Sequence, residues 1–380
     1  MAKILIIDDD KELLKKITRF LKKEGHTVFQ AYNGNIGLEV LKKENPDLVL
    51  CDILMPEMNG YKFTRIVKNH SVFKYTPVIM LTSLDMFNIQ HSAISTGADD
   101  YLLKPIDYDQ LKLRVIAMER IKQLYFELLE KDKKIQRELD MAQRIQFSFL
   151  PGKFPEFKDV AIYSRYYPAA VLSGDLYDVK KVAPGKCFFI CADVSGHGVP
   201  AALVQSSFRI ILSKYLDNYS DDLEKLFFMV NNELTALKIE STFVTATAGV
   251  FNFKNNSLQY INAGHPAAIL ITPEDVKLLK QTSSILGMFP DTHYKQIGIE
   301  FSYNDKFLFY TDGLVEIQDP ETHQWFRLKN LLSMIKKNRQ FPLNLILDII
   351  EEDVLNFKKG YRVNDDVAII GFSFAGKKEM

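Results

Sequence analysis

The sequence predicts two folded domains of different class, a doubly wound α/β domain followed by an α+β sandwich, joined by a long helix. Three observations support this prediction. Short apolar runs alternate with amphipathic stretches over residues 1–120, and helical spacing without Pro or Gly continues over residues 121–150. Many short strand-like runs separated by turns then fill residues 151–376. A chain of 380 residues is also longer than one hydrophobic core usually supports.

The first domain is expected to contain a five-stranded parallel sheet. Its apolar runs are nearly continuous, which is typical of parallel strands that are covered by helices on both faces. Four of these runs are ILII at 4–7, LVLC at 48–51, VIML at 78–81 and YLL at 101–103, which we take as the first, third, fourth and fifth strands. Ligands of such sheets bind beyond the carboxyl ends of the strands, so residues at those ends are the first candidates for a functional site.

Acidic residues stand at two of these strand ends. Asp8 and Asp9 follow the first strand directly, Asp52 follows the third, and Lys104 follows the fifth. We expect them to converge, and carboxylates in one pocket raise each other's pKa unless a cation such as Mg²⁺ neutralises them. One carboxylate can then attack a phosphoryl group, while Lys104 and Thr82 hold the phosphoryl oxygens.

The stretch from about residue 106 to 149 is predicted to be helical. Its first part is the last helix of the first domain, and the remainder forms the linker at 121–150. Apolar residues recur at a three-then-four spacing that is interrupted at Lys131, which is typical of a coiled coil. The helix can pair with a second copy or pack on its own domain, and Pro151 and Gly152 end it. The apolar positions are Ile121, Leu124, Leu128, Ile135, Leu139, Ala142, Ile145 and Phe149.

Four acidic motifs occur in the second domain. They are SGDLYD at 173–178, ADVSGHG at 192–198, YTDGLVE at 310–316 and NDDVAII at 364–370. Each lies beside an apolar run, and two of them carry a glycine next to the acid, which lets the backbone approach a ligand closely. Carboxylates without cysteine or a histidine cluster favour hard ions, Mg²⁺ or Mn²⁺. Two such ions about 4 Å apart can activate a bridging water and bind a phosphate ester.

The first domain resembles the receiver domain of two-component response regulators. The resemblance lies in ILIIDDD, LVLCDILMPEMNG, PVIMLTS and GADDYLLKP, in this order. It implies a histidine kinase as phosphodonor and phosphorylation of Asp52, and no required position is missing. The implied Mg²⁺ ligands are Asp8, Asp9, Asp52 and the backbone carbonyl of Leu54, and the implied switch residues are Thr82, Tyr101 and Lys104.

Residues from about 140 to 375 resemble PPM-type (type 2C) serine/threonine protein phosphatases of the SpoIIE-like branch. ELDMAQRIQFSFLP, FVTATAGVF, YINAGHP and SSILGM support the four acidic motifs. The resemblance implies two Mn²⁺ or Mg²⁺ ions and, as substrate, a phosphorylated anti-sigma-factor antagonist. The implied metal ligands are Asp175, Asp193 (bridging), the backbone carbonyl of Val194, Asp312 and Asp365. Asp178, Gly313 and Asp366 lie nearby in this scheme, and it leaves open which of Asp365 and Asp366 ligates metal.

Several residues depart from the family pattern or have open roles. Ser173 stands where many relatives have Gly, and Ala368 stands where Thr is common. His197 is a candidate general acid, although its spacing differs from that of eukaryotic relatives. His265 is expected to be structural. Arg165 could bind the substrate phosphate or be a surface charge.

The resulting prediction is a response regulator that controls a protein phosphatase, acting as a homodimer through receiver and linker helix. The alternative is a catalytically weak phosphatase-like module that sequesters a partner, but all four expected acids are present. SGDLYD also superficially resembles the motif of a nucleotide cyclase, in which the later acidic motifs have no place. Which kinase acts, and whether phosphorylation activates or inhibits, stays open.

Composition narrows the setting further. The formal net charge is zero and no basic recognition helix is evident, which argues against nucleic acid as a partner. No apolar run approaches the roughly 20 residues that span a membrane. Three cysteines fit a reduced compartment, and Cys187 and Cys191 are expected to be small buried residues. The protein is therefore expected in the cytoplasm.

Overall fold

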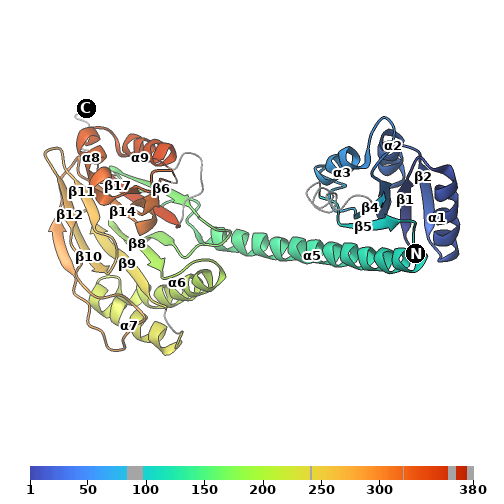
Figure 1. Ribbon diagram of the computed structural model, residues 1–380. Coiled ribbons are helices and arrows are strands. Elements are labelled where there is room, and N and C mark those ends of the chain that lie inside the picture. The colour runs from blue at the N-terminus through green and yellow to red at the C-terminus, as the bar shows by residue number, and fades with distance from the viewer. Residues whose placement is uncertain (84–96, 240–241, 320, 358–364, 375–380) are drawn as a thin grey trace. The chain divides into compact units, whose positions relative to one another are not determined.

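The computed structural model describes residues 1–83, 97–239, 242–319, 321–357 and 365–374 (Figure 1). The chain forms two compact units, Met1–Gln136 and Arg137–Met380. Residue 376, the predicted end of the second domain, and Asn364 of its last acidic motif lie outside the described residues. Within them no helix is long and apolar enough to cross a membrane.

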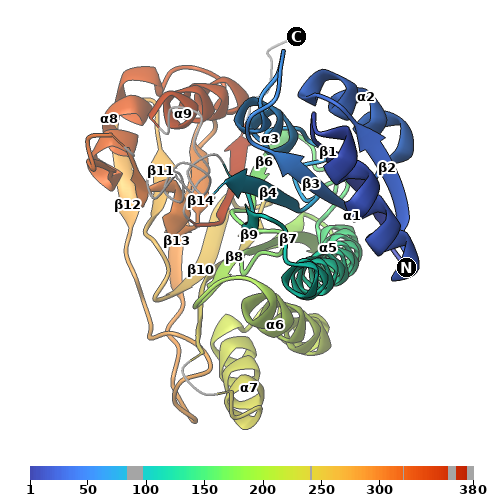
Figure 2. The same ribbon diagram turned by 45° about the vertical axis from the view of Figure 1, so that its right-hand side comes forward.

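The first unit contains the predicted parallel sheet, with five strands in the order β2-β1-β3-β4-β5. Helix α1 and the beginning of α5 cover one face of this sheet, and α2 and α3 cover the other. Figure 2 shows the strands beside α1 and α2. The elements are β1 (Lys3–Ile7), α1 (Lys11–Lys23), β2 (Thr27–Ala31), α2 (Gly34–Glu44), β3 (Leu48–Asp52), α3 (Gly60–Lys68), β4 (Val78–Ser83) and β5 (Asp100–Lys104).

Local signals explain where α1 begins. Asp10 caps the helix, because its carboxylate accepts hydrogen bonds from the N–H groups of Glu12 and Leu13. The buried side chains Leu14, Ile17 and Leu21 then follow at helical spacing. Asp10 therefore caps a helix, whereas Asp8 and Asp9 belong to the group of acids with Asp52.

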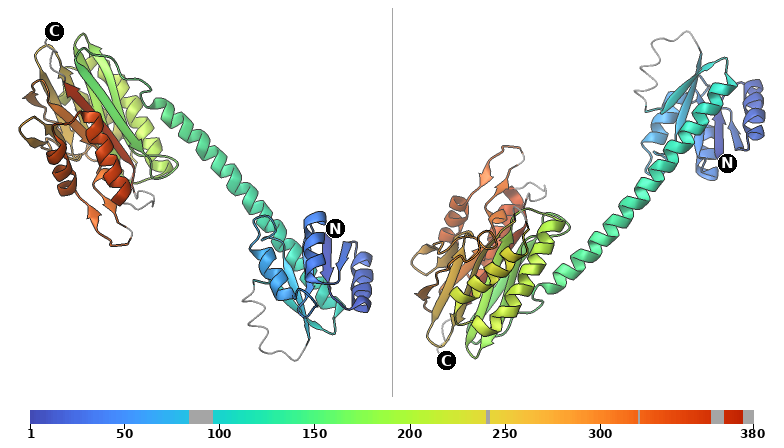
Figure 3. Two further views of the ribbon diagram at one scale, coloured as in Figure 1. Left: turned by 90° about the horizontal axis from the view of Figure 1, so that it is seen from above. Right: turned by 90° about the horizontal axis from the view of Figure 1, so that it is seen from below.

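The predicted linker is part of one helix, α5 (Tyr108–Phe149), of 42 residues. Figure 3 shows it as one unbroken helix. Lys131 interrupts the apolar pattern but not the helix, because Lys is a good helix former. The apolar side chains at Ile121, Leu124 and Leu128 are 51%, 56% and 63% exposed. The helix ends two residues before Pro151, as the sequence predicts.

The second unit is the predicted α+β sandwich of two antiparallel sheets. One has the strand order β13-β10-β9-β8-β7 and the other β12-β11-β14-β17-β6. Their inner faces share a core rich in phenylalanine, including Phe189, Phe251, Phe307 and Phe372. The strands are β6 (Val160–Tyr167), β7 (Leu176–Ala183), β8 (Lys186–Val194), β9 (Val244–Asn252), β10 (Ser257–Ala263), β11 (Ala268–Ile271), β12 (Val276–Leu279), β13 (Ile297–Glu300), β14 (Lys306–Tyr310) and β17 (Val367–Phe374).

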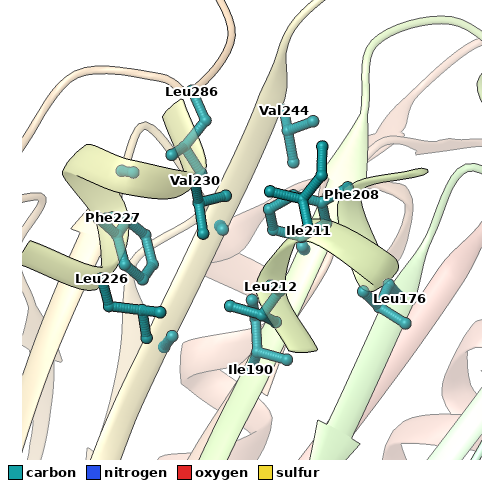
Figure 4. Packing of buried hydrophobic residues seen from close by; sticks show 14 of the residues in the cluster. Leu176, Ile190, Phe208, Ile211, Leu212, Leu226, Phe227, Val230, Val244 and Leu286 are labelled. Carbon is teal, nitrogen blue, oxygen red and sulfur yellow. The ribbon is translucent and has the colours of Figure 1, made fainter. Parts of the chain in front are cut away.

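Helices cover the outer face of each sheet. Helices α6 (Val199–Tyr219) and α7 (Leu223–Ala236) pack on the first sheet through Phe208, Phe227 and their neighbours (Figure 4). Helices α8 (Leu328–Asn338) and α9 (Leu343–Phe357) pack on the second. Pro342, which lacks an N–H donor, lies between these two helices. A small hairpin of β15 (Ile317–Gln318) and β16 (Trp325–Phe326) completes the unit.

Strand β8 shows how the sequence places a functional side chain. Its residues alternate between the two faces of the sheet. Cys187 and Cys191 face the inter-sheet core and are fully buried, as expected, while Ile190 faces the helices. The same alternation brings Asp193, two residues after Cys191, to the inter-sheet side at the end of the strand.

Candidate functional site

In the first unit, Asp8, Asp9 and Asp52 each bring a carboxylate oxygen to within 4.8 Å of the others. Asp8 directly follows β1, and Asp52 is the last residue of β3, next to β1 in the sheet. Asp8 and Asp52 are buried, whereas Asp9 is exposed. Three oxygen donors with this spacing fit a Mg²⁺ ion.

Lys104 joins these acids as the sequence predicts. Its ammonium nitrogen lies 2.7 Å from Oδ1 of Asp52 and 2.8 Å from Oδ2 of Asp8. Burial raises the pKa of Asp52, although Lys104 opposes this shift. Burial lowers the pKa of Lys104, but its hydrogen bonds to the two carboxylates outweigh that effect and raise it. The lysine is therefore a fixed cation beside the carboxylate that the resemblance assigns as phosphoacceptor.

The remaining receiver residues surround Asp52. Thr82 lies on β4, one position beyond Leu81, which is paired with Asp52 in the sheet register. Tyr101 is half-buried and packs against Ile53 and Met80. Leu54 follows in the loop after β3, with its side chain 60% exposed.

That loop depends on Gly60 at the start of α3. A Cβ atom there would lie 2.2 Å from the carbonyl oxygen of Asp52, so only glycine fits. The close approach fixes the loop between Asp52 and α3, on which Leu54 lies.

In the second unit, Asp175 and Asp193 lie side by side at the ends of β7 and β8. Gly174 packs against them, because a Cβ there would lie 3.0 Å from the Val194 carbonyl oxygen and 3.6 Å from Oδ1 of Asp193. Burial raises the pKa of Asp175 well above its usual value, and the charge of Asp193 adds to the shift. Burial, followed by the charges of Asp312 and Asp365, raises the pKa of Asp193 to about 7.

Asp312 and Asp365 reach the site from β14 and the turn before β17. Asp312 begins the short helix η1 (Asp312–Leu314), and Gly313 lets this turn pack tightly. A Cβ at Gly313 would lie 1.9 Å from the Asp366 carbonyl oxygen. Burial raises the pKa of both acids, and the charge of Asp312 adds to the shift at Asp365.

Asp365 and Asp366 differ in their surroundings. The buried carboxylate of Asp366 accepts hydrogen bonds from the N–H groups of Ala169 at 2.8 Å and Gly174 at 2.9 Å. The carboxylate of half-buried Asp365 accepts one from the Asp366 N–H at 2.8 Å. Asp366 thus holds the loop that leads to Asp175, while Asp365 keeps an oxygen available for an ion.

Thr311 belongs to the site but was not among the predicted residues. Its hydroxyl donates to Oδ2 of Asp175 at 2.7 Å and accepts from the Ala368 N–H at 2.8 Å. Thr311 is fully buried and directly precedes Asp312 in the YTDG motif, which is the only signal that the sequence offers. It supplies a hydroxyl beside the acids although position 368 is Ala.

Other candidates lie elsewhere. Asp178 faces α6, where it pairs with Arg209 at 3.2 Å, and the structure does not bring it to the other acids. Arg165 is engaged by Asp348 and Glu351 of α9, which matches the surface-charge interpretation. His197 is exposed in the loop before α6, near enough to Asp365 to lower its pKa slightly.

His265 has the surroundings of a structural residue. It is 5% exposed, and its Nδ1 lies 2.8 Å from the Thr245 hydroxyl. Burial lowers its pKa to about 3, so the imidazole is neutral. This agrees with the structural role expected from the sequence.

The second site is therefore a group of carboxylates whose pKa values are raised by burial and, at Asp175, Asp193 and Asp365, also by the charge of a neighbouring acid. The four carboxylates come from three strand ends and one turn. They are Asp175, Asp193, Asp312 and Asp365. In water-accessible surroundings such a group is stabilised by divalent cations, and an oxygen-only donor set fits Mg²⁺ or Mn²⁺.

Comparisons with known proteins divide the chain in the same way. The family model for stage II sporulation protein E (SpoIIE) matches residues 183–375, and that for the response regulator receiver domain matches residues 4–116. Protein PilH of Pseudomonas aeruginosa is 40% identical over 118 residues, which are 31% of this chain and 98% of PilH.

Two further relatives match a larger share of the chain. Protein IcfG of Synechocystis sp. is 26% identical over 260 residues, which are 61% of this chain but only 41% of IcfG. The solved SiaA-PP2C domain of Pseudomonas aeruginosa superposes with a TM-score of 0.57 at 20% identity, covering 64% of this chain and 98% of that domain. At this identity the superposition shows a shared fold.

Proposed function

The chain belongs to the family of stage II sporulation protein E and carries a response regulator receiver domain in front of its phosphatase domain; on this basis we propose that it is a metal-dependent phosphoserine/phosphothreonine phosphatase controlled by phosphorylation of Asp52. The observation that carries the proposal is the convergence of Asp175, Asp193, Asp312 and Asp365. Burial raises the pKa of each, and the charge of another acid of the group adds to the shift at Asp175, Asp193 and Asp365. Such a group binds divalent cations in preference to remaining ionised alone.

The roles follow from the position of each acid. The charge of Asp193 raises the pKa of Asp175, and the charges of Asp312 and Asp365 raise that of Asp193, so Asp193 is near the other three acids and suits a ligand shared by two ions. Asp175 and the Val194 carbonyl would hold the first ion, and Asp312 and Asp365 would hold the second. When bound, two such ions would supply an activated water and would withdraw charge from a phosphate ester.

Other residues organise this site without touching the substrate. Asp366 anchors the loop at Ala169 and Gly174, and Gly313 allows the Asp312 turn to approach it. Arg165 is engaged by α9, so the ions themselves must bind the substrate phosphate. The rate should therefore depend steeply on metal concentration.

In the receiver domain, Asp52 accepts the phosphoryl group from a histidine kinase, and Asp8 and Asp9 complete the Mg²⁺ site. Lys104, already 2.7 Å from Asp52, supplies the cation that pairs with the phosphoryl oxygens. The added charge of about −1.5 to −2 alters the face formed by Thr82 and Tyr101.

We assign the coupling between the two domains to a homodimer formed through the receiver and α5. The exposed apolar side chains of Ile121, Leu124 and Leu128 are the proposed contact with the second copy. As substrate we propose a phosphorylated anti-sigma-factor antagonist, by analogy with the SpoIIE-like branch.

The experiment is Mn²⁺-dependent release of phosphate from a phosphoserine protein of this class by the purified full chain. We expect release that disappears in Asp193→Ala and with chelator. Asp217→Asn, which changes an exposed acid of α6, is the matched control and should keep the wild-type rate. Phosphate release by Asp193→Ala equal to that of wild type would contradict the proposed function.

A further inference from the structure

The last turn of α5 holds the loop that carries Asp175. Gln146 is only 5% exposed, and its carboxamide forms two hydrogen bonds with the backbone of Ser173. Its Nε2 donates to the Ser173 carbonyl oxygen at 2.6 Å, and its Oε1 accepts from the Ser173 N–H at 3.1 Å. One buried side chain thus satisfies both polar backbone groups of a residue that lies 27 positions further along the chain.

Ser173 passes this constraint on to Asp175. Its hydroxyl accepts a hydrogen bond from the Asp175 N–H at 3.1 Å. Between them, Gly174 is held by Asp366 through its N–H at 2.9 Å and packs against the Val194 carbonyl. The turn of residues 173–175 is therefore fixed from α5 on one side and from the acidic site on the other.

A second contact of the same helical turn leads to the same residue. The ring of Phe147 meets that of Tyr166 edge to face, with centroids 5.9 Å apart. The Tyr166 hydroxyl donates to the Asp175 carbonyl oxygen at 3.3 Å, an oxygen that Gln205 of α6 also approaches at 3.4 Å. Both backbone groups of Asp175 are thus bonded to residues that α5 contacts.

A third contact reaches the strand that follows. Phe149 lies under the guanidinium group of Arg209, 5.8 Å from the ring centroid, and Arg209 pairs with Asp178 of β7. Three side chains of one helical turn therefore converge on the segment from Ser173 to Asp178. Such convergence is more than the end of a passive linker requires.

We propose that Gln146 is a positioning residue that holds the turn at 173–175 in the geometry with which Asp175 binds metal. The position of the last turn of α5 then sets the metal affinity of the phosphatase site. This inference rests on the proposed function, because it assigns a ligand role to Asp175. Loss of the carboxamide leaves both backbone groups of Ser173 buried without partners, which favours other conformations of the turn.

The magnitude follows from what is seen at other metal sites. Substituting a residue that orients a ligand typically lowers metal affinity about 10- to 100-fold. Gln146→Ala should therefore raise the Mn²⁺ concentration for half-maximal activity by about 10-fold or more, with the rate at saturating Mn²⁺ changed less. The substrate KM at saturating Mn²⁺ should stay near the wild-type value.

The experiment compares the full chain with Gln146→Ala, Gln146→Glu and Gln143→Ala. Gln143→Ala removes the same kind of side chain one turn earlier on α5, and its Mn²⁺ dependence should match that of wild type. Gln146→Glu keeps an acceptor for the Ser173 N–H but loses the donor, so its metal affinity should fall between those of wild type and Gln146→Ala. If Gln146→Ala does not fold, the Mn²⁺ affinity of Gln146→Glu tests the inference instead.

Metal binding is measured apart from activity. In an Asp9→Ala background, which removes the receiver metal site at an exposed position, free Mn²⁺ is followed by electron paramagnetic resonance. Weaker Mn²⁺ binding by the Gln146 variants than by Gln143→Ala supports the inference. Equal Mn²⁺ affinity in all variants of an active enzyme overturns it, whereas an inactive wild-type chain that binds no Mn²⁺ overturns the proposed function instead.

Discussion

The hydroxyl of Thr311 donates a 2.7 Å hydrogen bond to Oδ2 of Asp175 and accepts one from the Ala368 N–H at 2.8 Å. The hydroxyl hydrogen is directed at the carboxylate, because Oδ2 of Asp175 lies at 2.7 Å whereas the other acceptor, the Ala368 carbonyl oxygen, lies at 3.5 Å. This hydrogen bond orients the Asp175 carboxylate, while the Ser173 hydroxyl accepts from the Asp175 backbone N–H. Thr311, which is distant in sequence, and Ser173, which is close, thus define the position of one predicted metal ligand.

The Thr311 hydroxyl can be tested by substitutions of similar shape. Thr311→Val should lower metal-dependent activity about 10- to 100-fold, because a hydrogen bond to a charged group contributes roughly 1.5–3 kcal/mol. Thr311→Ser keeps the hydroxyl and should stay close to wild type. The measurement is phosphate release as a function of Mn²⁺ concentration. A Thr311→Val enzyme with the wild-type Mn²⁺ dependence would show that the hydroxyl is not needed.

Asp52 should be the phosphoacceptor of the receiver domain. Incubation with acetyl phosphate and Mg²⁺ should produce a phosphorylated species on Phos-tag gels in wild type but not in Asp52→Asn. Asp10→Asn is the matched control, because asparagine also caps helices and Asp10 only caps α1. A shifted band of normal intensity in Asp52→Asn would contradict the assignment.

Gly313 allows the turn of Asp312 to pack on the turn of Asp366. Because a Cβ there would lie 1.9 Å from a backbone oxygen, Gly313→Ala should move that turn and lower the free energy of unfolding by about 1–3 kcal/mol. Metal-dependent activity should fall with it. Gly152→Ala is the control, since no atom lies within 4 Å of its Cβ position. Urea unfolding curves for both variants provide the comparison, and equal midpoints would refute the packing argument.

His265 should make the second domain sensitive to acid. Burial lowers its pKa to about 3 in the native state from about 6.5 in the unfolded chain, so between these values only the unfolded chain takes up the proton. The free energy of unfolding therefore falls as the pH drops below about 6.5, by about 2 kcal/mol in total between pH 7 and pH 5.

This acid effect can be isolated with His265→Asn. The loss of stability between pH 7 and pH 5 should be about 2 kcal/mol smaller in the variant than in wild type. Fluorescence of Trp325 reports on this domain alone, since the chain has only 1 Trp. An identical pH dependence in both proteins would mean that another group takes up the proton.

Much of this architecture could be predicted because it depends on strand ends. Parallel strands bring Asp8, Asp52 and Lys104 to one edge whatever the loops between them do. The acidic motifs of the second domain likewise mark strand ends and turns. The interruption of the apolar pattern at Lys131 does not predict a break in the helix, because one charged residue does not end a helix.

What the sequence could not distinguish depends on contacts between distant segments. Asp365 and Asp366 are adjacent, and only the N–H groups of Ala169 and Gly174 show that Asp366 is engaged. Gln146 has the polarity of a surface residue on a helix, yet the fold buries it against Ser173. Local patterns do not encode such pairings.

The central claim is that phosphorylation of Asp52 controls the phosphatase. The most direct measurement is the Mn²⁺-dependent phosphatase rate of the full chain with and without acetyl phosphate, in wild type and Asp52→Asn. The account predicts that phosphodonor changes the wild-type rate about 5-fold or more, the lower range of allosteric coupling, and leaves that of Asp52→Asn unchanged. Equal wild-type rates with and without phosphodonor, despite complete phosphorylation of Asp52, would contradict it.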